Sequence, residues 1–258
     1  MTTASNNKRV VAWFSCGAAS AVAAKMALGM FPGQVQVVYC DTMSAEHPDN
    51  SRFFLDIERW LGVSILKIKS DKFASVDEVF EKRRYMSGPE GAACTVQMKK
   101  VPRFKFQRAD DIHVFGYTAD EKKRMKDFGK DNPEMALRWV LAENGIKKRD
   151  CYRILREAGI ELPAMYLLGY KNNNCLGCVK ASSPAYWAKV KRDFPEVFKK
   201  RAEQSRAIGC KLTRIKNKRI FLDALPEGNF GRYKVEDISC GPECAPARSK
   251  DSPEGAKP

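Results

Sequence analysis

The sequence predicts an α/β protein with a doubly wound parallel sheet, followed by a helical, basic region that contains cysteines. Three observations support this class. Apolar runs alternate with helical patterns along the first half of the chain. The first apolar run ends in a turn of small residues at 15–20, and lysine and arginine gather around paired cysteines after residue 170. Alternating strands and helices are typical of a parallel sheet that is covered on both faces.

The first strand and the turn after it predict a phosphate site. The apolar run 10–14 is the expected strand, residues 15–20 form the turn, and 21–28 is a strong helix-forming segment. Backbone N–H groups at such a turn, together with the positive end of the helix, attract an anion. The turn has neither the spaced glycines of a dinucleotide fingerprint nor a Gly-Lys-Ser/Thr ending. The alternative is a turn that serves tight packing alone.

Two further strand ends belong to the same predicted edge. A second strand, 34–40, ends in Asp41 and Thr42, and a helical pattern follows it. A third strand is expected at 64–69 and a fourth at 112–117, where Thr118 is a predicted N-cap with acids in the first turn. Parallel sheets bind ligands outside the carboxyl ends of their strands. Residues 132–159 are expected to form a helical insert that serves packing.

Composition limits the class of protein. The chain has 258 residues, no apolar run long enough to cross a bilayer, and no apolar signal region after the polar residues 1–8. We therefore expect a cytoplasmic protein without membrane contact; its oligomeric state stays open, a homodimer included. Nine cysteines without a secretory signal favour thiol chemistry or metal ligation over a disulfide framework.

The cysteines fall into two groups. Single cysteines in apolar or helical patterns are expected to be small buried side chains, and packing is also favoured for Cys16, although a thiol at a helix N-terminus can become reactive. Two close pairs in glycine-containing turns can supply four thiolates to one metal centre, and a further cysteine makes five candidates for four positions. These cysteines are expected to bind a 4Fe-4S cluster; the alternatives are that they bind zinc or that they bind no metal. The candidate metal ligands are Cys94, Cys175, Cys178, Cys240 and Cys244.

The charge distribution points to a polyanion. Residues 171–220 contain 14 lysines and arginines against 3 aspartates and glutamates, a surplus of 11 out of the net charge of +15. A one-signed surface favours nucleic acid, whereas the alternatives are an anionic small substrate or a solvated helix face. The predicted nucleic-acid contacts lie mainly on helices expected at 184–194 and 195–201: Lys180, Lys189, Lys191, Arg192, Lys199, Lys200 and Arg201.

Several motifs resemble one family. Residues 15–20 resemble the PP-loop, Ser-Gly-Gly-x-Asp-Ser, in which Ser15, Gly17 and Ser20 keep their places, while Cys16 replaces a glycine and Ala19 the aspartate. The Asp-Thr after the second strand and the segments 94–102, 116–121 and 173–180 are similar as well. The chain thus resembles, over roughly residues 8–244, the PAPS reductase-like family of the adenine nucleotide alpha-hydrolase fold, and is closest to its small iron-sulfur members.

The resemblance implies a site and a reaction. ATP, or a sulfonucleotide, would bind with Mg²⁺ and be cleaved between its α and β phosphates, activating an oxygen or nitrogen atom of a nucleic acid (tRNA or DNA) or nucleotide for sulfur transfer. The implied catalytic residues are Ser20, Cys94 and Lys99, with Lys99 or Lys100 offsetting charge on the leaving group. The implied nucleotide-binding residues are Ser15, Cys16, Gly17, Ala18, Ser20, Asp41, Thr42, Gly116, Tyr117 and Thr118.

Two other functions remain open at this stage. One is a sulfonucleotide reductase that releases sulfite, with Cys240 or Cys244 as its thiol. The other is a non-catalytic nucleotide or nucleic acid binding protein with a degenerate PP-loop. The expected organisation is a nucleotide-binding core over 8–130, a helical and cysteine-rich basic region over 131–244 packed on that core, and a disordered tail over 245–258.

Overall fold

A five-stranded, all-parallel sheet forms the centre of the protein. The computed structural model describes residues 8–231. The sheet has the order β3-β2-β1-β6-β7, and Val10 of β1 pairs with Val35 on one side and with Ile112 on the other. The α/β class and the parallel sheet are therefore confirmed. Its strands are β1 (Val10–Phe14), β2 (Val35–Cys40), β3 (Leu66–Ile68), β6 (Ile112–Val114) and β7 (Ala136–Arg138).

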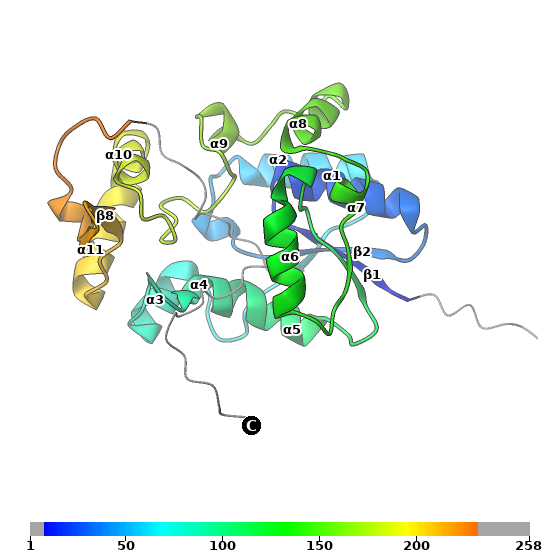
Figure 1. Ribbon diagram of the computed structural model, residues 1–258, viewed down its shortest axis with the longest axis horizontal. Helices are drawn as coiled ribbons and strands as arrows, with labels where there is room; N and C mark the ends of the chain where they lie inside the picture. The colour runs from blue at the N-terminus through cyan, green and yellow to red at the C-terminus, as the bar shows by residue number, and fades with distance from the viewer. Residues whose placement is uncertain (1–7, 232–258) are drawn as a thin grey trace, which may run out of the picture.

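Helices cover both faces of this sheet (Figure 1). Side chains of β1 alternate: Ala12 and Phe14 enter one buried cluster, whereas Val11 and Trp13 enter another, as the two-residue period of a strand requires. The first cluster lies under α1 (Ala18–Met30), α2 (Asn50–Leu61), α7 (Val140–Glu143) and α8 (Lys148–Glu157). The second lies under α5 (Val101–Phe106) and α6 (Lys122–Asp131).

The helical insert expected at 132–159 contains the helices α7 and α8 and also a strand, β7, that was not expected. The three residues of β7 pair in parallel with β6, and Leu137 pairs with His113. A three-residue strand is too short to produce a period-two pattern, so its pairing depends on the neighbouring strand rather than on local sequence. The strand expected at 112–117 is also shorter and ends at Val114. The residues after it form a loop at the edge of the sheet.

The order of strands reverses between β1 and β6. From β1 the chain builds β2 and β3 on one side, then makes a long excursion and returns as β6 on the other side of β1. The excursion contains α3 (Val76–Arg83), β4 (Ser87–Gly88), β5 (Gly91–Ala92), α4 (Ala93–Thr95) and a π-helical turn, Val96–Lys100. Such a reversal opens a crevice at the carboxyl ends of the two central strands.

A separate buried cluster joins the excursion to the C-terminal elements. Trp187 is fully buried in it, together with Phe80 of α3 and Met98. Asp77 of α3 also pairs with Arg201, so the first half of the chain is fixed to the second. Within residues 8–231 no helix is both long and apolar enough to span a membrane. The C-terminal elements are α9 (Ala164–Leu167), α10 (Pro184–Asp193), α11 (Pro195–Ile208), β8 (Thr213–Ile215) and β9 (Lys218–Ile220); short 3₁₀ turns lie at Met43–Ala45, Ala119–Glu121 and Leu222–Ala224.

A buried histidine couples the stability of the sheet to pH. His113 of β6 is 2% exposed and accepts a hydrogen bond at Nδ1 from Trp13 Nε1, 3.1 Å away. Its ring lies parallel to the rings of Trp13 and Phe115. Burial lowers the pKa of His113 to about 4, because the apolar surroundings disfavour the charged imidazolium.

We expect the free energy of unfolding to fall as the pH drops from 6.5, the ordinary pKa of histidine, to about 4, where folded His113 takes up its proton. The unfolded chain binds that proton first, so the loss reaches up to about 3 kcal/mol and then levels off. Denaturant titrations across this range measure it. His113→Phe is the control: carboxylates still titrate, but the histidine part of the slope is absent. If the free energy of unfolding depended on pH equally in both proteins, the attribution of this loss to His113 would be wrong.

Candidate functional site

A cleft of about 120 Å³ lies where the strand order reverses. Two loops bound it, one after β1 and one after β6, and residues from α8, α9 and the chain beyond α9 complete it. The cleft therefore lies at the place where open α/β sheets bind ligands. Its lining residues are Trp13, Ser15, Gly17, Ala19, Ser20, Gly116, Tyr117, Thr118, Glu121, Arg124, Lys148, Tyr166, Asn172, Asn173 and Asn174.

The loop after β1 is closed by the hydroxyl of Ser20. This hydroxyl accepts a hydrogen bond from the Ser15 backbone N–H at 3.1 Å and donates to the Gly17 carbonyl oxygen at 2.9 Å. The Ser15 hydroxyl also lies 3.2 Å from it. Ser20 is only 5% exposed. In this conformation the Ser20 hydroxyl is buried inside the loop and links its two ends.

Cys16 faces away from the cleft. Its backbone adopts a left-handed conformation with φ 56°, and its fully buried thiol donates to the Asn50 carbonyl oxygen at 3.5 Å. Burial raises the pKa of Cys16 well above its usual range. A thiol in this environment stays protonated and unreactive. The geometry agrees with the packing interpretation of this cysteine.

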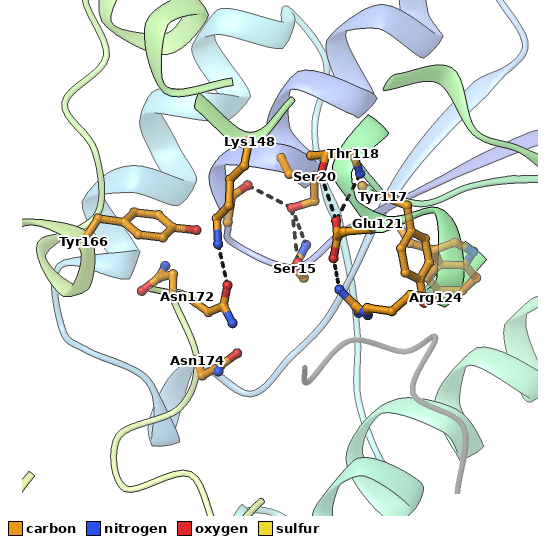
Figure 2. A pocket seen from close by; sticks show the side chains of 15 residues that line it. Ser15, Ser20, Tyr117, Thr118, Glu121, Arg124, Lys148, Tyr166, Asn172 and Asn174 are labelled. Atoms are coloured by element: carbon orange, nitrogen blue, oxygen red, sulfur yellow. Dashed lines mark hydrogen bonds and ion pairs between the residues drawn. The ribbon is translucent and has the colours of Figure 1, made fainter. Parts of the chain in front are cut away.

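The N-terminus of α1 receives a tyrosine from α9. Gly17 is the N-cap residue and supplies no side-chain hydrogen bond, while backbone hydrogen bonds from Ala18 and Asn173 reach the Tyr166 hydroxyl. Burial raises the pKa of Tyr166 to about 12, so the phenol is neutral near pH 7. Figure 2 shows Tyr166 and Lys148 on one side of Ser15 and Ser20, with Glu121 and Arg124 on the other.

The loop after β6 approaches α1 closely. A Cβ atom at Gly116 would lie 2.7 Å from both Cα and the backbone nitrogen of Ser20, so no larger residue fits without moving the backbone. Thr118 and Glu121 then form a capping box, which confirms Thr118 as an N-cap. The Glu121 carboxylate also pairs with Arg124, whose guanidinium lies 4.8 Å from the centre of the Tyr117 ring.

Lys148 brings a second cation to the cleft. Its Nζ donates to Asn172 Oδ1 at 2.5 Å and to the carbonyl oxygen of Lys171. Burial, followed by the nearby charge of Arg124, lowers the pKa of Lys148 to about 8. The ammonium has been partly removed from water and lies close to another positive charge. Both effects favour the approach of an anion.

Buried amides fix the floor of the cleft. Asn173 Nδ2 donates to the Cys16 carbonyl oxygen at 2.6 Å and to Asn50 Oδ1 at 2.8 Å. Asn50 Nδ2 in turn donates to the Glu46 carboxylate at 2.6 Å. These contacts connect the first loop, α2 and the segment 172–174.

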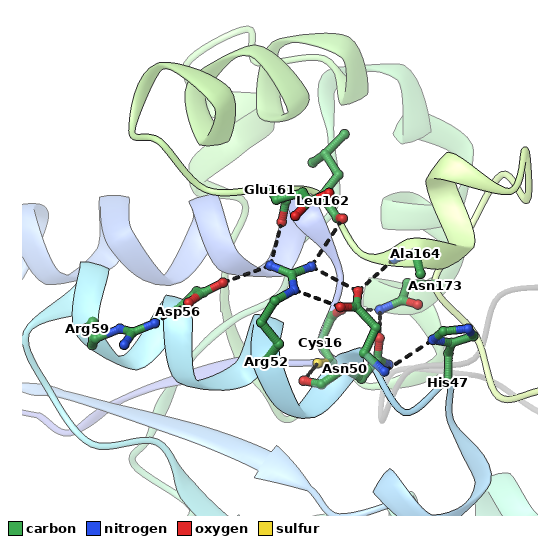
Figure 3. Close-up of polar contacts among 11 residues, drawn as sticks. Cys16, His47, Asn50, Arg52, Asp56, Arg59, Glu161, Leu162, Ala164 and Asn173 are labelled. Carbon is green, nitrogen blue, oxygen red and sulfur yellow. Dashed lines mark hydrogen bonds and ion pairs between the residues drawn. The ribbon is translucent and has the colours of Figure 1, made fainter.

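A second network fixes α9 above the loop (Figure 3). Arg52 of α2 donates to Asp49 at 2.7 and 2.9 Å, and also to the carbonyl oxygens of Glu161 and Leu162. Asp49 accepts from the backbone N–H of Ala164 at 2.8 Å. Arg52 lowers the pKa of Asp49, so this carboxylate stays charged. The network determines the position from which Tyr166 reaches α1.

The structure brings together part of the predicted nucleotide set. Asp41 follows β2 instead, where it lies 3.5 Å from Lys69 Nζ, and the buried Thr42 donates its hydroxyl to Glu46 at 2.6 Å. Ala18 and Cys16 are buried behind the loop, and Cys94 and Lys99 lie on the excursion, away from the cleft lining. The predicted residues that do line the cleft are Ser15, Gly17, Ser20, Gly116, Tyr117 and Thr118.

Cys175 and Cys178 lie directly after the cleft segment 172–174. Gly177 between them has φ 58° and sits against Val197, Arg201 and Trp187. Cys178 is 6% exposed, and its backbone N–H donates to the Tyr186 hydroxyl at 2.8 Å. Within residues 8–231 no three His, Cys, Asp or Glu side chains are grouped to hold a metal ion. Cys240 and Cys244 lie outside the described residues.

Several predicted nucleic-acid contacts are engaged in ion pairs. Lys189 and Arg192 pair with Asp193, and Lys191 pairs with Glu227. Lys200 pairs with Asp77, while Lys180 is half-buried and Lys199 exposed. Arg201 is only 5% exposed and holds α11 against α3 through Asp77. Burial of Arg201 and the ion pairs of Lys189, Lys191, Arg192 and Lys200 leave these five cations less available to a polyanion than the sequence suggests.

Sequence reasoning did not identify Lys148 and Tyr166. Each comes from a helix far along the chain from the phosphate loop, and neither belongs to a recognisable motif. The one local signal is Asp150, whose carboxylate accepts a hydrogen bond from the Lys147 backbone N–H at 2.9 Å and marks where α8 begins. The sequence matches no model of a known protein family, and no curated protein sequence matches it.

We expect Gly116→Ala to disturb the cleft, because the added methyl group meets the backbone at Ser20. The variant should lose about 1–3 kcal/mol of stability. It should bind ATP, the ligand that the family resemblance implies, roughly tenfold more weakly. Thermal melting and calorimetric titration measure the two effects. Gly129→Ala in α6 is the matched control, because its methyl group meets Leu137 at an ordinary 3.9 Å. Unchanged ATP affinity in Gly116→Ala would count against the cleft.

We expect the affinity for ATP to fall as the pH rises through about 8, the pKa of Lys148. Above that pH Lys148 of the ATP-free protein loses its charge, so the affinity for ATP drops by at most about tenfold per pH unit. Calorimetric titrations with ATP at several pH values between about 7 and about 9.5, a range that spans the titration of Lys148, measure the effect. Lys148→Gln should bind weakly with a flat profile, whereas Arg149→Gln, on an exposed neighbour, should retain the wild-type profile. A sloping profile in Lys148→Gln would exclude this lysine as its source.

Proposed function

We propose that this protein is an ATP-using enzyme of the PP-loop type, which adenylates an acceptor in a nucleic acid or nucleotide and so prepares it for sulfur transfer. The observation that carries the proposal is the cleft at the strand-order reversal, where Lys148 and Arg124 approach the loop at the N-terminus of α1. Helix N-termini and cations at such a crevice suit the phosphates of a nucleotide.

The proposed reaction begins with attack of an acceptor oxygen or nitrogen on the α-phosphorus of ATP. The bond between the α-phosphorus and the bridging oxygen breaks, and pyrophosphate leaves with that bond's electron pair. Lys148 and Arg124 offset the charge that develops on the leaving group. Where the acceptor is a carbonyl oxygen, inorganic sulfide then displaces AMP, so the carbonyl becomes a thiocarbonyl without net oxidation or reduction.

Other residues act by holding this geometry. Ser20 is proposed as a positioning residue, because its hydroxyl bonds to Ser15 and Gly17 within the loop. Glu121 supplies the carboxylate among the described cleft residues, at the position of the capping box. Mg²⁺ commonly binds one or two carboxylates together with substrate phosphates. In this proposal Glu121 and the phosphates would hold it, since Ala19 stands where the PP-loop has an aspartate.

The proposed metal centre stays separate from these roles. Cys175 and Cys178 are the described members of the proposed thiolate set, with Cys94, Cys240 or Cys244 as the others, for a 4Fe-4S cluster or zinc. The described residues alone do not complete a ligand group. The steps proposed above therefore assign no role to this cysteine-bound centre.

Calorimetric titration with ATP, ADP and AMP tests the nucleotide proposal. Affinity should rise with the number of phosphates, ATP binding at least about tenfold more tightly than AMP. Lys148→Gln should remove most of that difference. Equal affinities for ATP and AMP would exclude a phosphate site in the cleft. Binding of a sulfonucleotide but not ATP would favour the reductase instead, and ATP binding without release of pyrophosphate in the presence of RNA or DNA would favour a non-catalytic binding protein.

Anaerobic purification followed by iron, zinc and acid-labile sulfide analysis tests the metal proposal. Iron with matching sulfide should be found in the parent protein and lost in Cys175→Ala. Cys210→Ala is the matched control, because Cys210 is also half-exposed and its thiol already bonds to the Ser87 carbonyl oxygen at 3.3 Å. Zinc in place of iron would favour a structural site. Equal metal content in Cys175→Ala would exclude this cysteine as a ligand.

A further inference from the structure

The β8–β9 hairpin carries a dense group of cations at the surface. Five lysine and arginine side chains within nine residues are exposed. Inside residues 8–231 none of them takes part in an ion pair, in contrast to most of the cations on α10 and α11. Among the described C-terminal elements from α10 onward, cations without an ion pair therefore concentrate on this hairpin. The five cations are Lys211, which lies two residues before β8, and Arg214, Lys216, Lys218 and Arg219 within the hairpin.

The geometry of the hairpin works against its own stability. Arg214 lies directly opposite Arg219 in the strand register, and like charges in this position repel. The turn residues Lys216 and Asn217 both have positive φ, 44° and 62°. Asparagine adopts this conformation readily, but lysine does not. An anion bound between the strands would relieve the repulsion between the two arginines.

The hairpin is nevertheless firmly attached. The Thr213 hydroxyl donates to the Ser182 carbonyl oxygen at 3.1 Å, and the backbone N–H of Arg214 donates to the same oxygen at 3.0 Å. Thr213 is fully buried. Ser182 follows Cys178 closely in the chain, so the cations are presented from a fixed element next to the cysteine turn.

A groove of about 390 Å³ adjoins the hairpin. Tyr85 and Pro89 line it together with Lys211 and Arg219 of the hairpin region, and Arg84 adds a further cation. The Tyr85 hydroxyl donates to the Gly91 carbonyl oxygen at 3.2 Å, which fixes the ring. An aromatic ring surrounded by cations suits one unstacked base with its flanking phosphates.

We propose that the hairpin and this groove bind single-stranded nucleic acid, with phosphates along the hairpin and one base against Tyr85. The inference deepens the proposed function and rests on it for the identity of the acceptor. Charge complementarity favours this occupant over the chain's own C-terminal segment. Residues 232–258 contain five basic and five acidic residues and thus have no net charge.

Fluorescence anisotropy with the full-length protein and a labelled single strand of about 15 nucleotides tests the proposal. We expect removal of three hairpin cations to weaken binding at least tenfold at about 100 mM salt. The salt dependence, plotted as log K against log salt concentration, should become shallower by about 2, as expected for three lost phosphate contacts on a single strand. The variant combines Lys216→Ala, Lys218→Ala and Arg219→Ala.

A matched variant removes the same number of charges from the helices. Binding should fall less than about threefold in this control, because the phosphate contacts lie elsewhere. Equal losses in the two triple variants would show attraction by net charge alone and would overturn the proposal. The control combines Lys191→Ala, Lys199→Ala and Lys200→Ala; all three side chains are exposed.

Tyr85 separates base recognition from charge. Tyr85→Leu should weaken binding roughly fivefold or more, whereas Tyr85→Phe, which keeps the ring, should stay near the wild type. Either DNA or RNA that behaves in this way supports the proposal. A duplex or an anionic lipid vesicle that competes as well as the single strand would overturn it.

ATP titrations with the same proteins separate this inference from the proposed function. The hairpin variant should retain its ATP affinity, which also shows that it is folded. Hairpin-dependent binding of the single strand without any ATP binding would overturn the proposed function and leave the nucleic-acid surface standing. ATP binding without hairpin-dependent binding of the single strand would overturn the nucleic-acid surface and leave the proposed function standing.

Discussion

The side-chain amide of Asn173 is the contact on which the geometry of the site depends. It is 8% exposed and donates to the Cys16 carbonyl oxygen in the first loop and to Asn50 at the start of α2. Its two chain neighbours line the same cleft, and Cys175 follows within two residues. Because a buried amide donor is costly to leave unpaired, the loop, α2 and the segment that leads to the cysteine turn keep one relative position.

The distribution of charge follows from packing as much as from composition. Lysine and arginine are abundant across 171–220, but Asp77, Asp193 and Glu227 neutralise much of what α10 and α11 present. Two groups of cations matter for the proposals: Lys148 in the cleft, beside the Glu121–Arg124 pair, and the cations of the β8–β9 hairpin, which form no ion pair within residues 8–231. The first is enclosed and suits a small anion, whereas the second is open and suits a chain of phosphates.

The strand pattern was largely predictable, and the site only in part. The run at 10–14 was predictable as a strand because it is apolar and buried along its length, and the run at 34–40 because its residues from Val37 onward are apolar and buried, as in parallel strands. The strand β7 was missed because three residues carry no period. In the cleft, the small residues of the two loops were found because a close backbone approach demands small residues. Lys148 and Tyr166 were not found, because their roles depend on where distant helices pack.

The sequence by itself determined the class of fold, the phosphate-sized loop and the total positive charge, since these depend on local pattern and composition. Tertiary structure decided which groups face one another. In the folded protein the Cys16 side chain lies in the core, and the Thr42 hydroxyl donates to Glu46. Arg201 is buried, and Lys148 lies beside the first loop. These outcomes depend on contacts between residues far apart in the chain, and no local pattern specifies which partner a side chain meets after folding.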